Sequence, residues 1–442
     1  MIKEFEGKVA VITGAGSGIG LSLALAFAKK GMKIVLAEID EKRLKRASRK
    51  LDKIGAEFLA LKIDVSDPKQ VESLASEAYK HFGCVNILCN NAGIGGPGPL
   101  HLLELGDWNM TLGTNLFGVI YGIKYFVNRM YESGESCHIV NTASIGGHRV
   151  SGKHGSYSAS KFAVVSISEN LAIQSFNTNI GVSVLCPGFI NTNMSENTLA
   201  FRQKRTDLYK LFEANEADLM YLTNFSKLIK LGMDPDIVAK MVIHAIENDI
   251  FYIMTHHEWN KYLQARFERI NKDALKILEA FPEPVKEKKE KIYEYKSDNL
   301  SFSISYPDRL VQLLPTPKTS QVFYASKELF QDVEIHVSEI EPLIRLEDTT
   351  EILSDILKKV GNEIKIIFDR QITLEDGTIS NETEIEYLKF GTERIKSHHV
   401  SVIKDNKWIR VSSSAHPYYF SDDLINITHS LKFNVHTAEI SH

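Results

Sequence analysis

Short apolar runs alternate with amphipathic stretches through the first part of the chain. Val9–Thr13 is an apolar run of strand length, and positions 21–30 follow it with helical spacing up to Gly31. Runs without a polar face are typical of parallel strands that are buried on both sides. The pattern predicts strands at residues 9–13, 33–37, 58–64, 85–89, 138–142, 182–186 and 251–255, and helices at 21–30, 66–82, 108–131, 157–177 and 232–248. This alternation predicts a doubly wound parallel sheet in an α/β domain.

The pattern changes after a charged segment at residues 258–291, which has helical spacing and is interrupted by Pro282 and Pro284. Beyond it, apolar residues alternate singly, as in Phe302, Ile304 and Tyr306, which is typical of strands with one buried face. Further strands are predicted at 333–337, 364–368, 384–390, 400–403 and 407–411, and helices at 346–360 and 422–431. We therefore expect a smaller antiparallel α+β domain. The predicted organisation is a main domain at 1–270, a charged helical linker at 271–291 and an accessory domain at 292–436.

Composition excludes some classes of protein. The 442 residues carry a net charge of −4 and 43% apolar residues, which is ordinary for globular chains and gives no reason to expect a nucleic-acid partner. No apolar run reaches the ~20 residues that span a bilayer, and the first residues lack a signal-peptide pattern. The four cysteines and the histidine pairs at 256–257 and 398–399 lack metal-site spacing. We expect a cytoplasmic protein without a membrane span and without a bound metal.

The first predicted strand leads directly into a glycine-rich turn at residues 14–20, Gly-Ala-Gly-Ser-Gly-Ile-Gly. Glycines at such a turn let the backbone approach a pyrophosphate at the N-terminus of the next helix. Glu38 ends the second strand, 18 positions after Gly20. A carboxylate there can accept hydrogen bonds from an adenosine ribose and would repel a 2′-phosphate. Strand, turn and acid together predict a Rossmann-type dinucleotide-binding sheet.

Tyr157 and Lys161 are four positions apart, so they lie one turn apart on the same face of the predicted helix. A free tyrosine ionises near pH ~10, and a nearby ammonium group lowers that pKa. The pair is therefore a candidate general acid/base. Ser144 follows the strand at 138–142, and its hydroxyl could hold a substrate oxygen beside Tyr157.

These motifs together resemble the short-chain dehydrogenase/reductase (SDR) family over about residues 5–270. The residues that carry the resemblance are Thr13–Gly20, Asp64, Asn90–Gly93, Asn115, Ser144, Tyr157, Lys161, Pro187 and Gly188. The 13 positions from Ser144 to Tyr157 also match the family. The glycine spacing is that of its single-domain oxidoreductases rather than its sugar-nucleotide epimerases.

The resemblance implies a set of site residues. Tyr157 would be the acid/base, Lys161 would bind the nicotinamide ribose and tune Tyr157, Ser144 would position the substrate oxygen, and Asn115 would hold a water in the proton relay. The implied cofactor contacts are Gly14, Ser17, Gly18, Ile19, Gly20, Glu38, Asp64, Val65, Asn91, Ala92, Gly93, Tyr157, Lys161, Pro187, Gly188, Ile190 and Thr192.

The same resemblance predicts cofactor preference and assembly. NAD is expected in preference to NADP, because Glu38 would face the ribose, and because Ser17 and Ile39, which are often basic in NADP-using relatives, are uncharged here. Lys42 and Arg43 lie close to them in the sequence. A homodimer or homotetramer is expected, with the helices at 108–131 and 157–177 pairing between subunits.

We interpret the chain as an NAD-dependent oxidoreductase (EC 1.1.1.-) that transfers a hydride between a nicotinamide cofactor and a secondary alcohol or ketone. Residues 193–225 follow the nicotinamide-side strand and contain many apolar residues. They predict a lid over a fairly apolar substrate, with a pair of surface helices as the alternative.

Two other hypotheses are a nucleotide-sensing regulator that retains the fold and a partner-binding adaptor that acts through its C-terminal domain. That domain loosely resembles a PsbP-like α+β fold in its element order and in stretches such as 302–307 and 374–378. It shows no paired acids and no nucleophile constellation. We therefore expect it to bind a protein partner or support assembly rather than to be a second enzyme.

Overall fold

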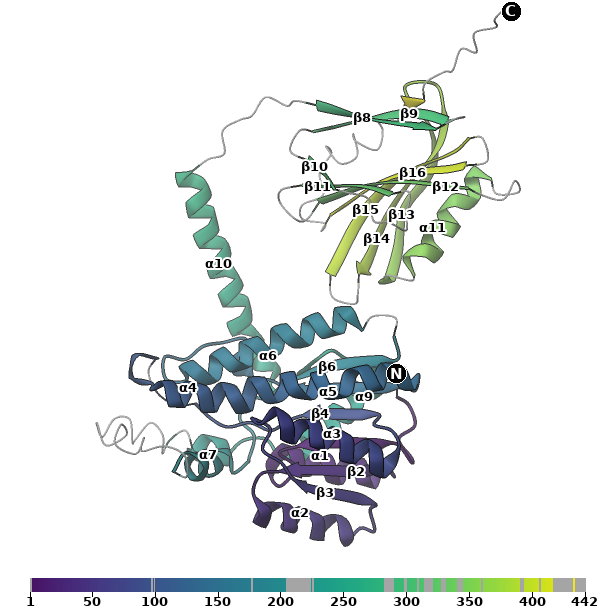
Figure 1. Ribbon diagram of the computed structural model, residues 1–442. Coiled ribbons are helices and arrows are strands. Elements are labelled where there is room, and N and C mark those ends of the chain that lie inside the picture. The colour runs from purple at the N-terminus through teal and green to yellow at the C-terminus, as the bar shows by residue number, and fades with distance from the viewer. Residues whose placement is uncertain are drawn as a thin grey trace, which may run out of the picture. The chain divides into compact units, whose positions relative to one another are not determined.

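The computed structural model divides into two compact units, Met1–Phe281 and Pro282–His442 (Figure 1). It describes residues 2–96, 98, 100–175, 178–203, 224, 226–281, 290–297, 300–307, 310–313, 321–326, 331–339, 345–358, 361–389, 393–404, 407–415 and 432–433. The predicted lid beyond residue 203 and the predicted helix at 422–431 lie largely or wholly outside these residues.

Unit 1 is built on a seven-stranded sheet of order β3-β2-β1-β4-β5-β6-β7. Its strands are β1 (Val9–Thr13), β2 (Lys33–Glu38), β3 (Phe58–Lys62), β4 (Ile87–Asn90), β5 (Cys137–Thr142), β6 (Ile180–Cys186) and β7 (Tyr252–Met254). Every neighbouring pair is parallel. The order reverses between β1 and β4, and ligands of such sheets bind at the carboxyl ends of the strands at that point. The predicted Rossmann-type fold is confirmed.

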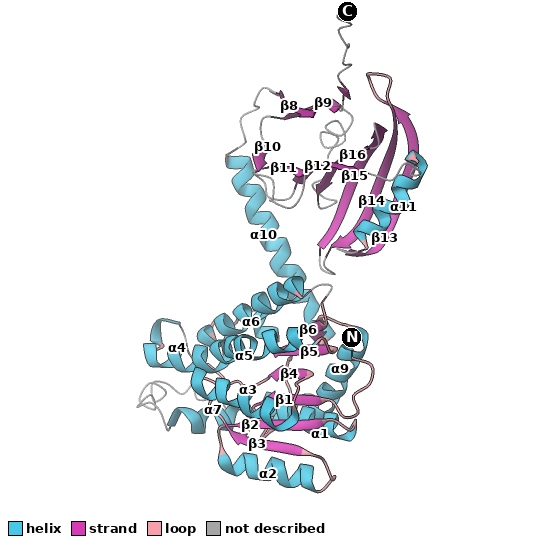
Figure 2. Ribbon diagram, turned by 45° about the vertical axis from the view of Figure 1, so that its right-hand side comes forward, coloured by secondary structure: helices cyan, strands magenta, loops and turns pink. Residues whose placement is uncertain are grey.

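Helices cover both faces of this sheet (Figure 2). The helices α1 (Gly18–Lys29), α2 (Glu41–Asp52) and α9 (Pro235–Asn248) pack on one face, and α3 (Pro68–Phe82), α5 (Gly118–Ser133) and α6 (Gly155–Gln174) pack on the other. Three of them begin at an aspartate, Asp40, Asp67 or Asp234, whose carboxylate accepts a backbone N–H of the first turn. The strands are therefore buried from both sides, which explains their apolar sequences.

The stretch predicted as one helix at 108–131 is three elements. Helix α4 (Leu105–Leu112) passes into a π-helical turn at Gly113–Phe117, which passes into α5. A π turn widens the backbone by one residue and occurs often at functional sites. The hydrophobic periodicity of the sequence could not reveal the π-helical turn, because the apolar residues on either side of the turn keep ordinary α-helical spacing.

Unit 2 contains a seven-stranded sheet of order β10-β11-β12-β16-β15-β14-β13 and a smaller sheet of order β17-β9-β8. The strands are β8 (Glu290–Ser297), β9 (Leu300–Pro307), β10 (Leu310–Leu313), β11 (Gln321–Ser326), β12 (Gln331–Glu339), β13 (Gly361–Thr373), β14 (Ile379–Lys389), β15 (Glu393–Lys404), β16 (Lys407–Ala415) and β17 (Lys432–Phe433). All of their pairings are antiparallel. Helix α11 (Thr349–Leu357) packs Leu353 and Leu357 on this larger sheet. The expected antiparallel α+β architecture is confirmed.

The segment between the predicted domains differs from the expectation. Helix α10 (Asn260–Ala280) ends before the two prolines, whereas Glu290 and Lys291 already belong to strand β8. The charged run that ends at Lys291 has no hydrophobic periodicity. Its last two residues therefore follow the strand pattern of the residues that come after them. Within the described residues, no helix is long and apolar enough to cross a membrane.

Candidate active site

The turn between β1 and α1 is tight because its glycines allow conformations closed to other residues. Gly14 and Gly18 have φ of +66° and +54°, which is left-handed backbone that glycine adopts without strain. A side chain at Gly20 would collide with the carbonyl oxygen of Gly14. The turn therefore brings the N-terminus of α1 to the edge of the sheet, where the backbone N–H groups of a helix start favour a phosphate.

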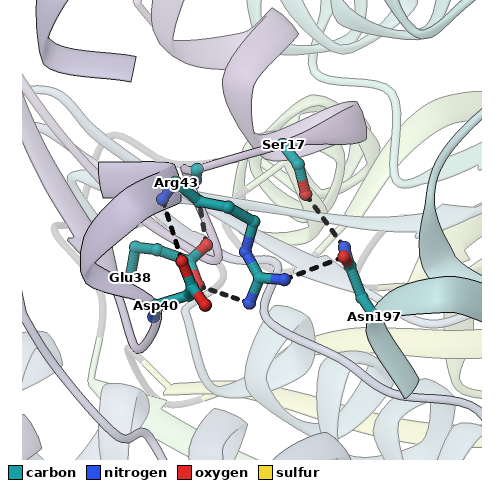
Figure 3. Close-up of polar contacts among 6 residues, drawn as sticks. Ser17, Glu38, Asp40, Arg43 and Asn197 are labelled. Atoms are coloured by element: carbon teal, nitrogen blue, oxygen red, sulfur yellow. Dashed lines mark hydrogen bonds and ion pairs between the residues drawn. The ribbon is translucent and has the colours of Figure 1, made fainter. Parts of the chain in front are cut away.

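Glu38 lies beside this turn at the end of β2 and is 5% exposed. Its Oε2 accepts the Gly16 N–H at 3.1 Å, and its Oε1 accepts the Asp40 N–H and an Arg43 Nη2–H, both at 3.0 Å. Figure 3 shows that Arg43 continues to Asn197 of helix α7 (Met194–Gln203), whose Oδ1 accepts from Nη1 at 2.8 Å. The predicted ribose-binding acid is thus the centre of a buried ion pair.

The predicted adenine-side residues lie at the ends of β3 and β4. Asp64 accepts the Ser66 N–H and hydroxyl on one carboxylate oxygen, at 3.0 and 2.7 Å. The Thr13 hydroxyl oxygen accepts the N–H groups of Asn91 and Ala92, at 2.9 and 3.0 Å. These bonds fasten the loop after β4 to the end of β1, and so hold Asn91, Ala92 and Gly93 along one wall of the site.

Ser144 and Tyr157 converge from two different elements. Ser144 begins a short 3₁₀ turn after β5, and Tyr157 lies in the first turn of α6. A Cβ atom placed on Gly146 would lie 3.2 Å from Tyr157 Cε1 and 3.4 Å from Ser144 Oγ. Glycine at 146 therefore leaves room for both of these side chains beside it.

Lys161 lies on the same face of α6 and is buried. Its Nζ donates to the Thr142 carbonyl at 2.8 Å and lies 5.8 Å from the centroid of the Tyr157 ring. Burial lowers the pKa of Lys161 to about 8. Burial also raises the pKa of Tyr157 above its ordinary value, against a smaller lowering by its hydrogen bond with Ser144. The expected lowering by Lys161 is not what the structure shows, because the ammonium group is directed at a carbonyl and desolvation of the phenol dominates.

Asn115 occupies the π-helical turn and is fully buried. Its Oδ1 accepts the Ile94 N–H at 2.8 Å, and its Nδ2 donates to the Ile94 carbonyl at 2.9 Å and to Ser160 Oγ at 3.1 Å. The side chain thus holds the loop after β4 against α6. The water-holding role of Asn115 stays a prediction.

One cavity of about 840 Å³ joins these groups. It is lined by Ser144, Tyr157, Lys161 and every predicted cofactor contact, whereas Asn115 lies behind the wall. Met194, Asn197 and Thr198, which also line the cavity, lie in the segment predicted as a lid. Further lining residues that the sequence did not single out as contacts include Arg43, Thr142, His154, Phe189, Leu228, Ile229 and Trp259. Arg43 follows Glu38 by five positions and had a local signal, whereas the others are brought in by loops and helices without a motif.

The end of the cavity beyond Tyr157 is mostly apolar and aromatic. Trp259 meets the Phe189 ring edge-on with 5.5 Å between centroids. The His154 ring lies 6.4 Å from the Tyr157 ring, and burial lowers the pKa of His154 to about 4, so this imidazole is neutral at physiological pH. The lining near Trp259 also includes Arg149, whose guanidinium lies 5.7 Å from the centroid of the Trp259 ring.

The reversal of strand order, the glycine turn and the serine, tyrosine and lysine cluster define the class of the protein as an α/β oxidoreductase with a dinucleotide site. A family model described as short chain dehydrogenase matches residues 8–203. A CLA biosynthesis dehydrogenase/reductase of Lactiplantibacillus plantarum is 34% identical, over 62% of this chain and 96% of the relative. The chain belongs to the short-chain dehydrogenase/reductase family.

Two further comparisons agree with this assignment. A C alpha-dehydrogenase of Sphingobium sp. is 30% identical, over 67% of this chain and 96% of the relative. The crystal structure of a short chain dehydrogenase/reductase from Burkholderia phymatum in complex with NAD is 37% identical, with a TM-score of 0.58, and covers 62% of this chain and 97% of that one. These matches support a nicotinamide cofactor in unit 1.

Proposed function

We propose that the protein transfers a hydride between NAD and a fairly apolar secondary alcohol or its ketone. The observation that carries the proposal is the convergence of Ser144 and Tyr157 in the cavity that also contains Glu38 and the glycine turn. The cavity, at about 840 Å³, lies in the range of ordinary cofactor and substrate sites. Glycines 14, 18 and 20 stand where side chains would collide with neighbouring atoms, so the residues fit a dinucleotide.

When bound, the nicotinamide cofactor supplies the hydride donor or acceptor. Ser144 is placed to donate a hydrogen bond to the substrate oxygen. The Tyr157 hydroxyl gives that oxygen its proton in reduction, and the Tyr157 phenolate takes the proton from the alcohol in oxidation. Lys161 supplies positive charge beside the Tyr157 ring. Ser144 and Lys161 are buried and Tyr157 is half-buried, and the limited access of water strengthens these polar interactions.

NAD is proposed as the preferred cofactor. The buried Glu38 carboxylate already pairs with Arg43, so a 2′-phosphate would meet a negative charge and a guanidinium that is already engaged. The presence of Arg43 near the ribose site is therefore consistent with a preference for NAD, because Glu38 already balances the charge of Arg43.

A homo-oligomer in the cytoplasm is also proposed. Leu105, Phe117 and Ile173, on or beside the helices predicted to pair, are 81%, 43% and 42% exposed. Exposed apolar side chains on helices that are predicted to pair are what a subunit interface would cover. Light scattering at micromolar concentration should give a mass of at least two chains, and a monomeric mass would contradict the assembly.

The experiment that tests the activity is a panel of secondary alcohols of increasing apolar size, offered to the full chain with NAD, while reduced nicotinamide is followed by absorbance. We expect turnover with at least one alcohol and a rise in kcat/KM with apolar area. Matched primary alcohols and carboxylic acids serve as controls. Failure of every alcohol and every corresponding ketone, with either cofactor, would contradict the proposal.

A further inference from the structure

Helix α7 is fastened to the rest of unit 1 by two consecutive side chains, Asn197 and Thr198. Asn197 accepts from Arg43 Nη1 at 2.8 Å and donates from Nδ2 to Ser17 Oγ at 3.2 Å. Thr198 Oγ1 accepts the Gly95 N–H at 2.8 Å. Figure 3 shows Asn197 placed between Ser17 and Arg43. All five residues line the cavity, so α7 is held on two sides of the proposed cofactor site.

The chemistry of the partners fixes the orientation of the Asn197 amide. Guanidinium groups only donate, so the amide oxygen must face Arg43 and the amide nitrogen must face Ser17. Arg43 is itself held by Glu38 at 3.0 Å, a pair that is largely shielded from water. The position of Asn197 is thus set by a buried ion pair, and a hydrogen bond to a charged group is stronger than a neutral one.

Ser17 is used in an unusual way. It is the N-cap residue of α1, and serine is favoured there because its hydroxyl usually accepts an N–H of the first turn. Here the side chain of Ser17 makes no such capping bond and instead accepts from Asn197, 180 positions later in the chain. The loop that would cradle the pyrophosphate is therefore joined directly to α7.

We propose that Asn197 is a positioning residue that makes α7 a strap across the bound dinucleotide, and that this strap determines how fast the cofactor dissociates. The inference rests on the proposed function only in taking a nicotinamide dinucleotide as the ligand of the cavity. Asn197 touches none of the groups that move the proton or position the substrate oxygen. Loss of its side chain therefore changes cofactor release and leaves the hydride step in place.

The test is stopped-flow measurement of NADH dissociation from the full chain, with excess NAD as the displacing ligand. Asn197→Ala should raise the dissociation rate constant about tenfold, the equivalent of one hydrogen bond to a charged group. The single-turnover rate of the hydride step should stay within about twofold of the wild-type rate, and kcat should stay equal or rise where product release limits turnover.

Asn193→Ala is the matched control. Asn193 lies just before α7 and is exposed, and its backbone carbonyl, which accepts the Asn197 N–H, is kept by the substitution. Thr198→Val is a second variant, which keeps the volume and removes the bond to Gly95. It should also speed dissociation, whereas Asn193→Ala should match the wild type.

The outcomes separate this inference from the proposed function. One outcome is that wild-type protein binds NADH while Asn197→Ala releases it no faster than Asn193→Ala does. That result would contradict the proposal that α7 retains the cofactor, and it would leave the proposed cofactor site supported. If Asn197→Ala slows the hydride step and leaves release unchanged, Asn197 acts on the reacting groups and the strap is again wrong. If the wild type binds neither NADH nor NADPH, the proposed function itself fails.

Discussion

The two large sheets of the molecule bury polar side chains for different purposes. In unit 1 the polar groups predicted to be functional, such as Glu38 and Ser144, lie at or just past the carboxyl ends of the strands and line a cavity. In unit 2 the polar groups lie within the strands and bond one another, as His398 does with Glu382 at 2.8 Å across β15 and β14. His399 likewise lies between Ser397 and Ser412, at 2.8 Å from each hydroxyl oxygen.

The difference shows why burial of a polar residue is not sufficient to identify a site. Fully buried polar groups that satisfy each other fix the pairing of strands and give a sheet its register. Polar groups that are buried beside a cavity keep hydrogen-bonding capacity for a ligand. By this criterion the chemistry belongs to unit 1, and four experiments test that separation.

The largest effect should come from Tyr157→Phe. Loss of a general acid/base costs typically ~10²–10⁴-fold in rate, so we expect turnover to fall by that factor while NADH binding, followed by fluorescence titration, changes little. Tyr252→Phe is the matched control, because Tyr252 lies outside the cavity lining and should keep normal turnover. If Tyr157→Phe kept a third or more of the wild-type turnover number under conditions in which the chemical step is rate-limiting, Tyr157 would not be the general acid/base.

A smaller effect is expected from Glu38→Ser. The substitution releases Arg43 from its ion pair and removes the charge that repels a 2′-phosphate. The ratio of kcat/KM for NAD to that for NADP should fall by roughly 10–100-fold, the worth of a charge-assisted hydrogen bond. Lys42→Ala is the control and should leave the ratio unchanged, because Lys42 is exposed. Wild-type protein with equal efficiency for both cofactors would contradict the assignment of Glu38.

The pH dependence of ketone reduction should follow Lys161. Reduction needs Tyr157 protonated, and the raised pKa of Tyr157 keeps it protonated through the neutral range. Burial lowers the pKa of Lys161 to about 8, so its positive charge is present below that pH and is lost as pH rises through it. We expect kcat/KM to be level below pH ~7 and to fall toward about tenfold per unit above pH ~8.

Lys161→Met distinguishes this explanation from others. The kcat/KM of this variant for ketone reduction should be low at every pH and should not decrease near pH 8. The same fall in the methionine variant would show that another group titrates there.

The smallest effect should come from removing unit 2. A protein of residues 1–281 keeps the whole parallel sheet and the cavity lining, and a domain of that size can bury its own core. Its turnover with the best alcohol should stay within about twofold of the full chain. Soluble, cofactor-binding protein that does not turn over would show that unit 2 completes the site, and the separation of the two units would be wrong.

The sequence predicted what depends on local pattern. The strands of unit 1, the glycine turn and the Tyr157–Lys161 spacing are local, and every predicted cofactor contact lines the cavity. Asn197 could not be predicted, because it meets Arg43 from 154 positions away and no motif marks it. The π-helical turn at Asn115 was missed because one extra residue in a turn leaves the apolar spacing on each side intact.

In unit 2 the pattern predicted the architecture but not the polar pairs. The register of β14 with β15 places His398 opposite Glu384, so that His398 reaches Glu382 diagonally, and alternation alone does not fix that register. The raised pKa of Tyr157 was also beyond the sequence, because it depends on how completely the fold removes the phenol from water.

The central claim is that hydride passes between a secondary alcohol carbon and a nicotinamide in the cavity of unit 1, with Tyr157 moving the hydroxyl proton. The most direct test uses an alcohol with turnover in the panel, labelled with deuterium on the carbinol carbon and incubated with NAD and the full chain. Mass spectrometry of the recovered cofactor should show one deuterium in the reduced nicotinamide, and far less of it when Tyr157→Phe replaces the wild type. Deuterium that appears in water rather than in the cofactor, or equal labelling by both proteins, would contradict the account.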